Sequence, residues 1–503
     1  MISKGEGIFH LESEGIEMDN NVLTGIEPAP VFHFFEEICK IPHGSGNEEK
    51  LSDYLKAFAE ARGLYCIQDD WKNIIMIKEA APGYEAEETM ILQGHMDMVA
   101  VKEESCDIDM QTEPLRLMRD GDFVSAKGTS LGGDDGIAVA YLLALLDAKE
   151  IPHPRLEVIL TVGEETGMDG AREIDVSMLQ GRRMLNLDNE EEGVLLASCA
   201  GGVRADCKLP VMWESREGAV LLIQVGGLCG GHSGAEINKE RGNSNCLMGR
   251  ILDSLLQRLS VSLISLEGGL ADNAIPRQTA ARIVVKPEDM DTCFSIVREM
   301  EKQIQKELSG KDDGVTVTIS KEKEQDEQMV KCLKEESVQK VGAYLLAMPN
   351  GVQAMSADVD GLVETSLNMG MMKLEEEYLT LSYAIRSSVE SAKEAVCRKL
   401  SAISYLAGAK VDMRGNYPGW AYRKNSPLRD KMIRIYEEMY GEKPRVEAIH
   451  AGLECGLFAG KLPELDCISC GPDMQNIHTT KEVLSISSVK RVWEYLLEIL
   501  GQK

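Results

Sequence analysis

The feature that most limits the fold of this chain is a series of short apolar segments, each ending in acidic residues or a histidine. The segments are NIIMIKE (73–79), TMILQGHMDMV (89–99), LEVILTVGEE (156–165) and RRMLNLDNEE (182–191). The second and third are separated by a long apolar stretch of helical character, DDGIAVAYLLALLDAKE. Alternating strands and helices predict an α/β sheet, and ligands of such sheets collect at the carboxyl ends of the strands. We therefore expect the chemistry at these strand ends.

The domain organisation follows from the length and from two changes of pattern. A chain of 503 residues is too long for one compact core. From about residue 204 the strands and helices take an α+β pattern, and the α/β pattern returns near residue 415. We predict a catalytic domain in two parts, 1–203 and 415–503, with a central mixed sheet flanked by helices. Residues 1–25 are an N-terminal extension, and residues 204–414 form an inserted α+β domain.

Charge and cysteine content exclude several classes of protein. The 54 basic and 83 acidic residues give a net charge of −29, which opposes binding to a nucleic-acid phosphate backbone. No apolar run is long enough for a membrane helix, and the N-terminus lacks the apolar core of a signal peptide, so we predict a cytoplasmic protein. The 13 scattered cysteines do not indicate a disulfide framework, and Cys467 and Cys470 are expected to be small buried residues.

Two motifs offer metal ligands near the start of the predicted sheet. In GHMDMV, His95 and Asp97 alternate along a strand, so His95 can bind a metal while Asp97 accepts its second N–H. In GGDDGIA, Asp134 and Asp135 precede an apolar helix. We expect one of this pair to cap the helix and the other to bind metal.

Three later motifs complete the candidate set. Glu164 and Glu165 follow a buried strand, where one carboxylate can ligate a metal while the other takes a proton from water; a solvated turn is the alternative. Another strand ends at Asp188, and the following run 190–192 is expected to be solvated. Near the C-terminus, His478 lies in the polar loop CGPDMQNIHTTKE. Converging carboxylates and imidazoles are what a two-metal hydrolase requires.

The order and spacing of these motifs resemble the M20 metallopeptidase family. GHMDMV, GGDDGIA, EETGMDGA, NLDNEEEG and IHTTKE follow one another along the chain. Further stretches are similar to its aminoacyl-histidine dipeptidase branch: ICKIPHGSGNE, GGHSGAEINKERGN, DNAIPR, ETSLNMG and HAGLECGLF. The resemblance extends from about residue 30 to the C-terminus, and it implies a catalytic α/β domain that binds two metals and carries an inserted lid.

The resemblance also implies a set of metal ligands. His95 and Asp188 would hold one metal, Glu165 and His478 the other, and Asp134 would bridge the two. The cofactor would be two divalent cations, expected to be zinc, with Mn²⁺ and Co²⁺ as alternatives because the same ligands accept them. The family pattern has Asn where this chain has Asp135, whose role stays open.

Catalytic and substrate-binding roles are implied in the same way. Glu164 resembles the general base, and Asp97 its companion behind the metal-binding histidine. In the inserted domain, His232 resembles the histidine that stabilises the oxyanion, while Asn273 and Arg386 resemble substrate-binding residues. An arginine is suited to pairing with the terminal carboxylate of a dipeptide.

The implied activity is hydrolysis of unblocked dipeptides, Xaa-His among them, by a metal-activated water with Glu164 as general base. One alternative is a related amidohydrolase acting on N-acyl amino acids or short peptides. Another is a catalytically inactive peptide- or metal-binding protein of the same fold. The expected partner is a dipeptide, with no nucleic acid and no membrane, and a homodimer is left open.

Overall fold

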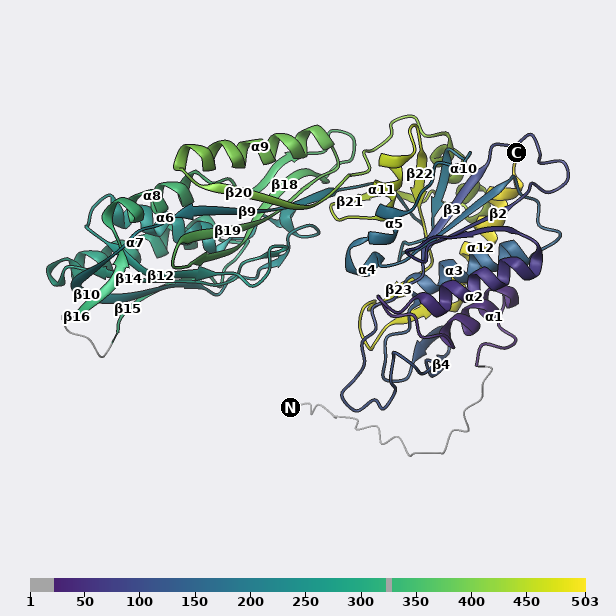
Figure 1. Ribbon diagram of the computed structural model, residues 1–503, viewed down its shortest axis with the longest axis horizontal. Coiled ribbons are helices and arrows are strands. Elements are labelled where there is room, and N and C mark those ends of the chain that lie inside the picture. The colour runs from purple at the N-terminus through teal and green to yellow at the C-terminus, as the bar shows by residue number, and fades with distance from the viewer. Residues whose placement is uncertain (1–21, 323–327) are drawn as a thin grey trace, which may run out of the picture. The chain divides into compact units, whose positions relative to one another are not determined.

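The computed structural model describes residues 22–322 and 328–503, which fall into two compact units (Figure 1). The first unit takes in the described residues of Met1–Ile174, together with Leu187–Glu192 and Cys470–Lys503. The second consists of Asp175–Asn186 and Gly193–Ser469. Of the predicted N-terminal extension, residues 1–21 lie outside the described part of the chain. The predicted boundaries near 204 and 415 stay a prediction.

The first unit contains two groups of strands. One has the order β1 (Tyr65–Gln68), β2 (Ile74–Lys78), β6 (Leu156–Thr161) and β3 (Met90–His95). The pairs β1–β2 and β2–β6 are antiparallel and β6–β3 is parallel, so this sheet is mixed, as expected. A second, four-stranded sheet has the order β23 (Met474–Gln475), β24 (Val483–Ser485), β5 (Phe123–Ala126) and β4 (Leu117–Asp120).

The helices of the first unit are α1 (Ala29–Cys39), α2 (Glu49–Arg62), α3 (Gly133–Asp147), α4 (Glu164–Gly167), α5 (Asp169–Glu173) and α12 (Ile486–Gly501). The first fourteen residues of α3 are all buried, which explains its apolar sequence. Tyr141 of α3 stacks on Trp493 of α12, with ring centroids 6.0 Å apart, and donates its O–H to the Val489 carbonyl. Helix α12, near the C-terminus, is thus part of the packing around α3.

Four strands of the second unit follow the α/β pattern. Their order is β7 (Arg183–Asn186), β22 (Asp466–Ser469), β8 (Val194–Cys199) and β21 (Arg445–Ile449). The pairs β7–β22 and β8–β21 are parallel. Helices α10 (Pro427–Tyr440) and α11 (Glu454–Lys461) lie in the same part of the chain. The side chain of Ser426 caps α10, and Gly441 ends it in a left-handed conformation.

A large antiparallel sheet forms the rest of the second unit. Its order is β15 (Thr316–Lys321), β10 (Trp213–Gly226), β14 (Thr279–Val285), β12 (Ser262–Gly268), β18 (Val363–Leu374), β19 (Tyr378–Ser387), β9 (Gly201–Pro210) and β20 (Lys410–Tyr417). In addition, β16 (Gln328–Leu333) pairs with β10 and β17 (Gly351–Met355) with β18. A separate ribbon pairs β11 (Gly231–His232) with β13 (Ala274–Ile275).

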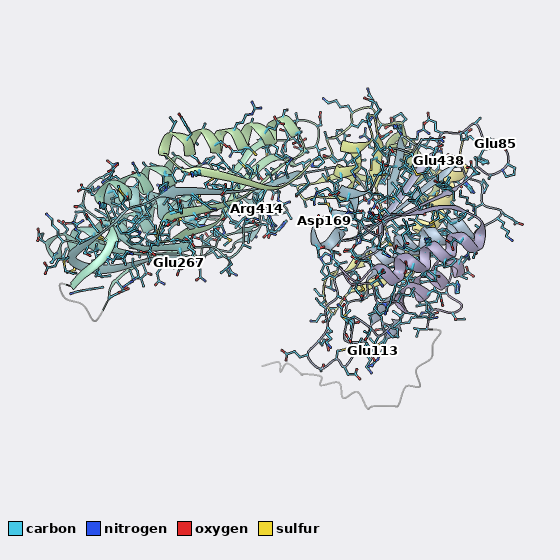
Figure 2. All side chains as sticks on the ribbon, viewed as in Figure 1. Glu85, Glu113, Asp169, Glu267, Arg414 and Glu438 are labelled. Atoms are coloured by element: carbon cyan, nitrogen blue, oxygen red, sulfur yellow. The ribbon has the colours of Figure 1, made fainter. Side chains whose placement is uncertain are left out.

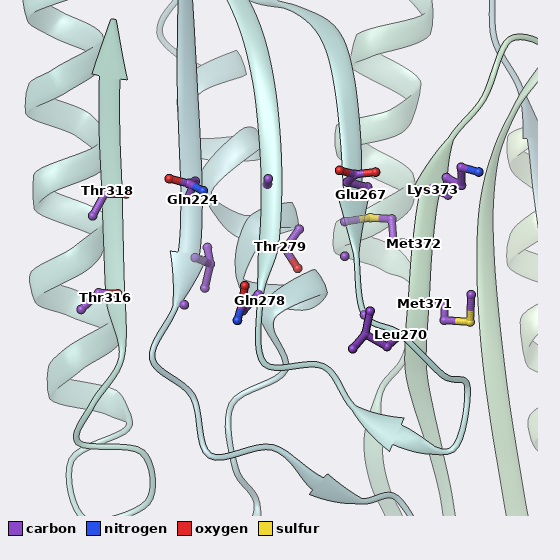
Figure 3. Close-up of a pocket in the computed structure, with 15 residues that line it drawn as sticks. Gln224, Glu267, Leu270, Gln278, Thr279, Thr316, Thr318, Met371, Met372 and Lys373 are labelled. Carbon is purple, nitrogen blue, oxygen red and sulfur yellow. The ribbon is translucent and has the colours of Figure 1, made fainter. Parts of the chain in front are cut away.

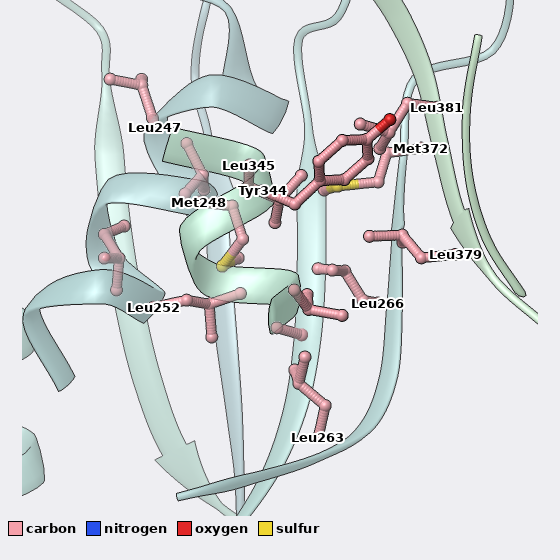
Figure 4. Close-up of a cluster of buried hydrophobic side chains, with 14 of the residues drawn as sticks. Leu247, Met248, Leu252, Leu263, Leu266, Tyr344, Leu345, Met372, Leu379 and Leu381 are labelled. Carbon is pink, nitrogen blue, oxygen red and sulfur yellow. The ribbon is translucent and has the colours of Figure 1, made fainter. Parts of the chain in front are cut away.

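Helices cover one face of this sheet (Figure 1). They are α6 (Ser244–Leu256), α7 (Met290–Glu307), α8 (Glu335–Ala347) and α9 (Glu390–Ala407), and short 3₁₀ turns lie at Ile237–Lys239 and Pro287–Asp289. Leu247 and Leu252 of α6, Leu345 of α8 and Leu266 of β12 belong to one buried cluster (Figure 4). The predicted α/β fold class, with a central mixed sheet and further helices and strands in an α+β pattern, is confirmed.

Acidic side chains lie on the surface, as the net negative charge of the sequence leads one to expect. Glu85, Glu113 and Glu438 are exposed carboxylates on the periphery (Figure 2). None of the helices in the described part of the chain is both long enough and apolar enough to span a membrane. All thirteen cysteines are thiols, and Cys467 and Cys470 are buried, as predicted.

Candidate active site

The first candidate ligands lie where β3 ends. The prediction that His95 and Asp97 share a strand is wrong, because β3 ends at His95 and Asp97 lies in the irregular segment that follows. The two remain neighbours: His95 Nδ1 lies 3.4 Å from Asp97 Oδ1 and 3.0 Å from the Asp97 carbonyl oxygen. Both residues are 1% exposed. The second ring nitrogen, Nε2, is therefore left to face the other candidate ligands.

Asp97 joins three segments of the first unit. Its carboxylate accepts the Ser45 hydroxyl at 2.8 Å and the backbone N–H groups of Glu164 and Glu165 at 3.0 and 3.3 Å. Burial alone would raise the pKa of Asp97, but hydrogen bonding and the charge of His95 lower it. An ionised Asp97 therefore fixes both the ring of His95 and the beginning of α4.

Asp134 lies between the two predicted metal-binding histidines. Its Oδ1 is 3.1 Å from Nε2 of His95, and its Oδ2 is 3.1 Å from Nε2 of His478. Glu165 Oε1 lies 2.8 Å from the same nitrogen of His478, and Asp188 Oδ1 lies 3.5 Å from Nε2 of His95. The structure thus brings all five predicted metal ligands together, in two sets that share Asp134.

The electrostatics of this cluster favour bound positive charge. Burial would lower the pKa of His95, yet the Asp188 charge and hydrogen bonding to Asp134 raise it well above its usual value. Hydrogen bonds to Asp134 and Glu165 raise the pKa of His478 to about 10. Burial raises the pKa of Asp188 to about 6.

The same cluster fits a pair of divalent cations. Its donor atoms are carboxylate oxygens and imidazole nitrogens, which suit Zn²⁺, Mn²⁺ and Co²⁺. Potential ligand atoms of His95, Asp134 and Glu165 lie within 4.8 Å of one another, as do those of His95, Asp135 and Asp188. The excess of carboxylates over histidines would be compensated by such cations.

The capping prediction for the aspartate pair is wrong. No side chain of the first turn caps α3, and Asp134 and Asp135 do not have helical backbone angles. Asp135 Oδ2 instead accepts the backbone N–H of His95 at 3.0 Å. Burial, followed by the charge of Asp188, raises the pKa of Asp135 well above its usual value. The first N–H groups of α3 are accepted by Glu482, a residue that the sequence reasoning did not single out.

The acidic run after Asp188 is only partly solvated. Glu190 and Glu191 are exposed, as predicted. Glu192 is only partly exposed, because Arg491 of α12 donates to both of its carboxylate oxygens, at 2.6 Å each. The prediction of a solvated run failed at Glu192 because its cationic partner lies 299 residues away in the sequence.

In the second unit, His232 lies on β11 of the β11–β13 ribbon, and Asn273 directly precedes β13. His232 pairs with Ala274, and the Ser233 N–H donates to the Asn273 carbonyl oxygen at 2.8 Å. His232 is exposed, and its pKa is lowered by partial burial and by the charge of Arg386. A neutral imidazole of this kind can donate one N–H to a ligand.

Arg386 lies on β19 beside a histidine that sequence reasoning missed. Its Nη1 donates to the Tyr417 hydroxyl at 3.4 Å, while its buried Nε has no hydrogen-bond partner among the described residues. His450 is 6% exposed, and its Nε2 lies 2.7 Å from the Ser366 hydroxyl. Burial and the charge of Arg386 lower the pKa of His450 to about 3. His450 belongs to the HAGLECGLF stretch, but only its burial beside an arginine distinguishes it.

Asn368 is a second missed residue, because it supports the ribbon through backbone atoms. Its side-chain amide donates to the carbonyl oxygens of Asp272 and Ala274, at 3.0 and 2.8 Å, on either side of Asn273. Asn368 and Ser366 alternate along β18 and therefore face the same side of the sheet. One strand thus supports both the ribbon and His450.

An open groove of about 570 Å³ lies on the large sheet (Figure 3). Its lining includes Gln224, Gln278, Thr316, Thr318 and Lys373. Gln224 alternates along β10 with the core residues Ile223 and Val225, so the groove is on the face opposite the helices. None of its lining residues is a predicted catalytic or metal-binding residue.

Comparisons of sequence and of fold relate this chain to known peptidases. The family model of peptidase family M20/M25/M40 matches residues 91–502. The cytosol non-specific dipeptidase of Escherichia coli (strain K12) is 35% identical over 482 residues, covering 95% of this chain and 99% of the relative. The crystal structure of aminoacylhistidine dipeptidase from Vibrio alginolyticus matches with a TM-score of 0.90 and 36% identity, covering 96% of this chain and 99% of the other. Aminopeptidase PepT from Bacillus cereus, at 14% identity and a TM-score of 0.54 over 95% of this chain and 98% of its own, shares the fold. The chain belongs to peptidase family M20/M25/M40.

Proposed function

We propose that this protein is a metal-dependent dipeptidase that hydrolyses the peptide bond of unblocked dipeptides, with Xaa-His among its substrates. The observation that carries the proposal is the position of Asp134 between His95 and His478, next to the Glu164–Glu165 pair. Its support from similarity is the identity of 35–36% with two dipeptidases across nearly the whole chain. The name of the Escherichia coli relative supports a cytosolic location.

The proposed cofactor is a pair of divalent cations, with zinc as the first choice and Mn²⁺ or Co²⁺ as alternatives. His95 and Asp188 would hold one, Glu165 and His478 the other, and Asp134 both. When bound, such cations polarise the peptide carbonyl and lower the pKa of water. The protein's own contribution is to hold five ligands in place before the cations arrive.

Glu164 is the proposed general base and acid. Its backbone N–H is held by Asp97 at 3.0 Å, and Asp97 also holds the N–H of the proposed ligand Glu165. The Glu164 carboxylate takes a proton from the attacking water and then returns it to the leaving amino group. A single carboxylate therefore serves both halves of the proton transfer.

Residues of the second unit are proposed to bind the substrate. His232, kept neutral by burial and by Arg386, donates an N–H to the oxyanion. Arg386, whose Nε has no partner within the described chain, pairs with the terminal carboxylate of the dipeptide. Asn273 is the third proposed contact. We propose residues 204–414 as the inserted lid that carries these side chains.

The proposal is tested by assaying chelator-treated protein on β-Ala-His and Gly-Gly with Zn²⁺, Mn²⁺ or Co²⁺ added back. We expect metal-dependent cleavage of free dipeptides, and no cleavage of N-acetylated dipeptides or longer peptides. Cleavage of N-acyl amino acids alone would instead identify the related amidohydrolase. Cation binding without cleavage of either substrate class would identify an inactive binding protein.

A further inference from the structure

Glu482 is a buried carboxylate that lies four residues after His478. It is 3% exposed and accepts backbone N–H groups from four consecutive residues. Oε2 accepts those of Leu131 and Gly132 at 2.8 and 3.1 Å, and Oε1 accepts those of Gly133 and Asp134 at 2.8 and 3.4 Å. The whole turn that leads into α3 is therefore bound to one side chain.

This arrangement compensates the charge of Glu482. A carboxylate without partners is costly to bury, and burial does raise the pKa of Glu482, while the N–H groups of Gly132, Leu131 and Gly133 lower it. Gly133 and Asp134 lie at the kinked start of α3, before its regular part, so their N–H groups have no helical acceptor. The positive end of the helix dipole also favours an anion here. Glu482 thus caps α3 from a distant part of the sequence.

The turn itself is shaped for this contact. Gly132 has a left-handed backbone, with a φ of 70°, and a Cβ there would approach the Met98 sulfur to 2.7 Å. At Gly133 a Cβ would lie 3.2 Å from both Glu482 Oε1 and the Met474 sulfur. Side chains at these two positions would therefore push against Met98, Met474 or the carboxylate itself.

The same segment of chain contacts Asp134 at two places. His478 lies 3.1 Å from the Asp134 carboxylate, and Glu482 binds the Asp134 backbone. The two contacts come from residues on one short connection between β23 and β24. If the Glu482 contact is lost, this connection keeps its contact with the Asp134 carboxylate but no longer fixes the Asp134 backbone.

We propose that Glu482 is a positioning residue of the metal centre: it fixes the turn 131–134 so that the Asp134 carboxylate faces His95 and His478 together. This inference rests on the proposed function, because it concerns the ligand that is proposed to hold both cations. Glu482 acts through Asp134 and does not itself contact substrate. Its loss should weaken cation binding beyond any general loss of stability.

The test compares Glu482→Gln with Asp466→Asn. Asp466 is a matched control: it is 5% exposed, and its carboxylate accepts the Ser426 hydroxyl at 2.5 Å and the Leu428 N–H at 3.0 Å at the start of α10. Zn²⁺ is titrated into chelator-treated protein by calorimetry, and the visible spectrum of the Co²⁺-loaded protein is recorded. Thermal unfolding of each metal-free protein measures the general loss of stability.

We expect Glu482→Gln to weaken Zn²⁺ binding by about 10- to 100-fold and to alter the Co²⁺ spectrum, as changes behind metal ligands commonly do. Asp466→Asn should lower the melting temperature while leaving cation affinity and spectrum as in the wild type. Wild-type affinity and spectrum in Glu482→Gln would overturn the inference, whatever its melting temperature.

A second variant covers the case in which Glu482→Gln does not fold. Gly133→Ala places a methyl group 3.2 Å from Glu482 Oε1 and disturbs the same contact from the other side. It should shift affinity and spectrum in the same direction, and a wild-type result would again overturn the inference. A wild-type protein that binds no cation would overturn the proposed function as well, so the two failures can be told apart.

Discussion

Glu164 and Glu165 are adjacent residues held by the same aspartate, yet they have different proposed tasks. The Glu165 carboxylate is 2.8 Å from the His478 ring, whereas Glu164 is the residue left for proton transfer. Replacing Glu164 by Gln keeps the size of the side chain but removes the carboxylate that would take up the proton. We expect kcat to fall by about 10²- to 10⁴-fold, the usual contribution of general acid–base catalysis.

Cation binding should survive the Glu164→Gln change, because none of the five proposed ligands is altered. Steady-state kinetics on a dipeptide and a Zn²⁺ titration of the same sample measure both quantities. Glu113→Gln, at an exposed glutamate, is the control for loss of one surface charge. Near-normal turnover in Glu164→Gln would contradict its proposed role.

His450 should give the protein a pH-dependent stability. Burial and the charge of Arg386 hold its pKa at about 3, below the usual 6.5, so the unfolded chain binds a proton there before the folded chain does. The free energy of unfolding should therefore fall as the pH drops from about 6.5 towards 3, by up to about 1.4 kcal/mol per pH unit.

Replacing His450 by Gln should remove this dependence and flatten the pH profile of stability relative to the wild type. Urea unfolding of both proteins at several pH values between neutrality and about pH 4 measures the difference. Parallel profiles would show that His450 titrates alike in the folded and unfolded states. Because the comparison is a difference, contributions from the other histidines largely cancel.

At the scale of elements, β18 supports the β11–β13 ribbon through Asn368. Replacing Asn368 by Ala removes this donor from the carbonyl oxygens of the buried Asp272 and the half-buried Ala274. Each unpaired group costs about 1–3 kcal/mol. His232 lies on the ribbon and Asn273 directly precedes β13, and both are proposed substrate contacts. The KM for a dipeptide should therefore rise while Zn²⁺ affinity stays unchanged.

Asn245→Ala is the matched control for Asn368→Ala. Asn245 is also fully buried and donates to the Met369 carbonyl at 3.2 Å, but it does not hold the ribbon. It should lower stability without the increase in KM. Equal KM values in the two variants would show that Asn368 acts only on stability.

Most elements could be predicted from sequence because their patterns are local. Helix α3 and the strands β2, β3, β6 and β7 lie where the apolar segments of the sequence indicated. The five proposed ligands were also identifiable, because each falls in a short motif. What failed depended on distant partners: α3 is capped by Glu482, 348 residues away from Asp134, and Glu192 pairs with Arg491. Every residue except proline has a backbone N–H, so the sequence does not indicate which of them a distant carboxylate will bind. Nor does it indicate which of many arginines will pair with Glu192.

At the scale of the whole molecule, the proposed cofactor should stabilise the fold. Three carboxylates converge on two histidines, and a cation bound only by the folded protein raises its stability. With free Zn²⁺ at 100 times its dissociation constant, we expect a gain of about 2.7 kcal/mol per site. Calorimetry of the protein with chelator and with added Zn²⁺ measures it.

The control for this effect is His478→Ala, which removes one proposed ligand. Its melting temperature should rise less on adding Zn²⁺ than that of the wild type. Mg²⁺, which prefers oxygen ligands, should give a smaller rise than Zn²⁺ in both proteins. No rise with any cation would contradict the proposed metal site.

The contact between Asp134 and His478 also has a consequence for biosynthesis. The two residues are 344 positions apart. After Asp134 has been added to the growing chain, the ribosome must therefore synthesise that whole stretch before His478 is present. Until then the nascent chain presents His95, Asp134, Glu165 and Asp188 without their last partner. The large antiparallel sheet of the second unit, which is encoded entirely within this interval, can therefore fold before the centre is complete. We therefore expect the proposed metal site to be loaded only after His478 has been synthesised.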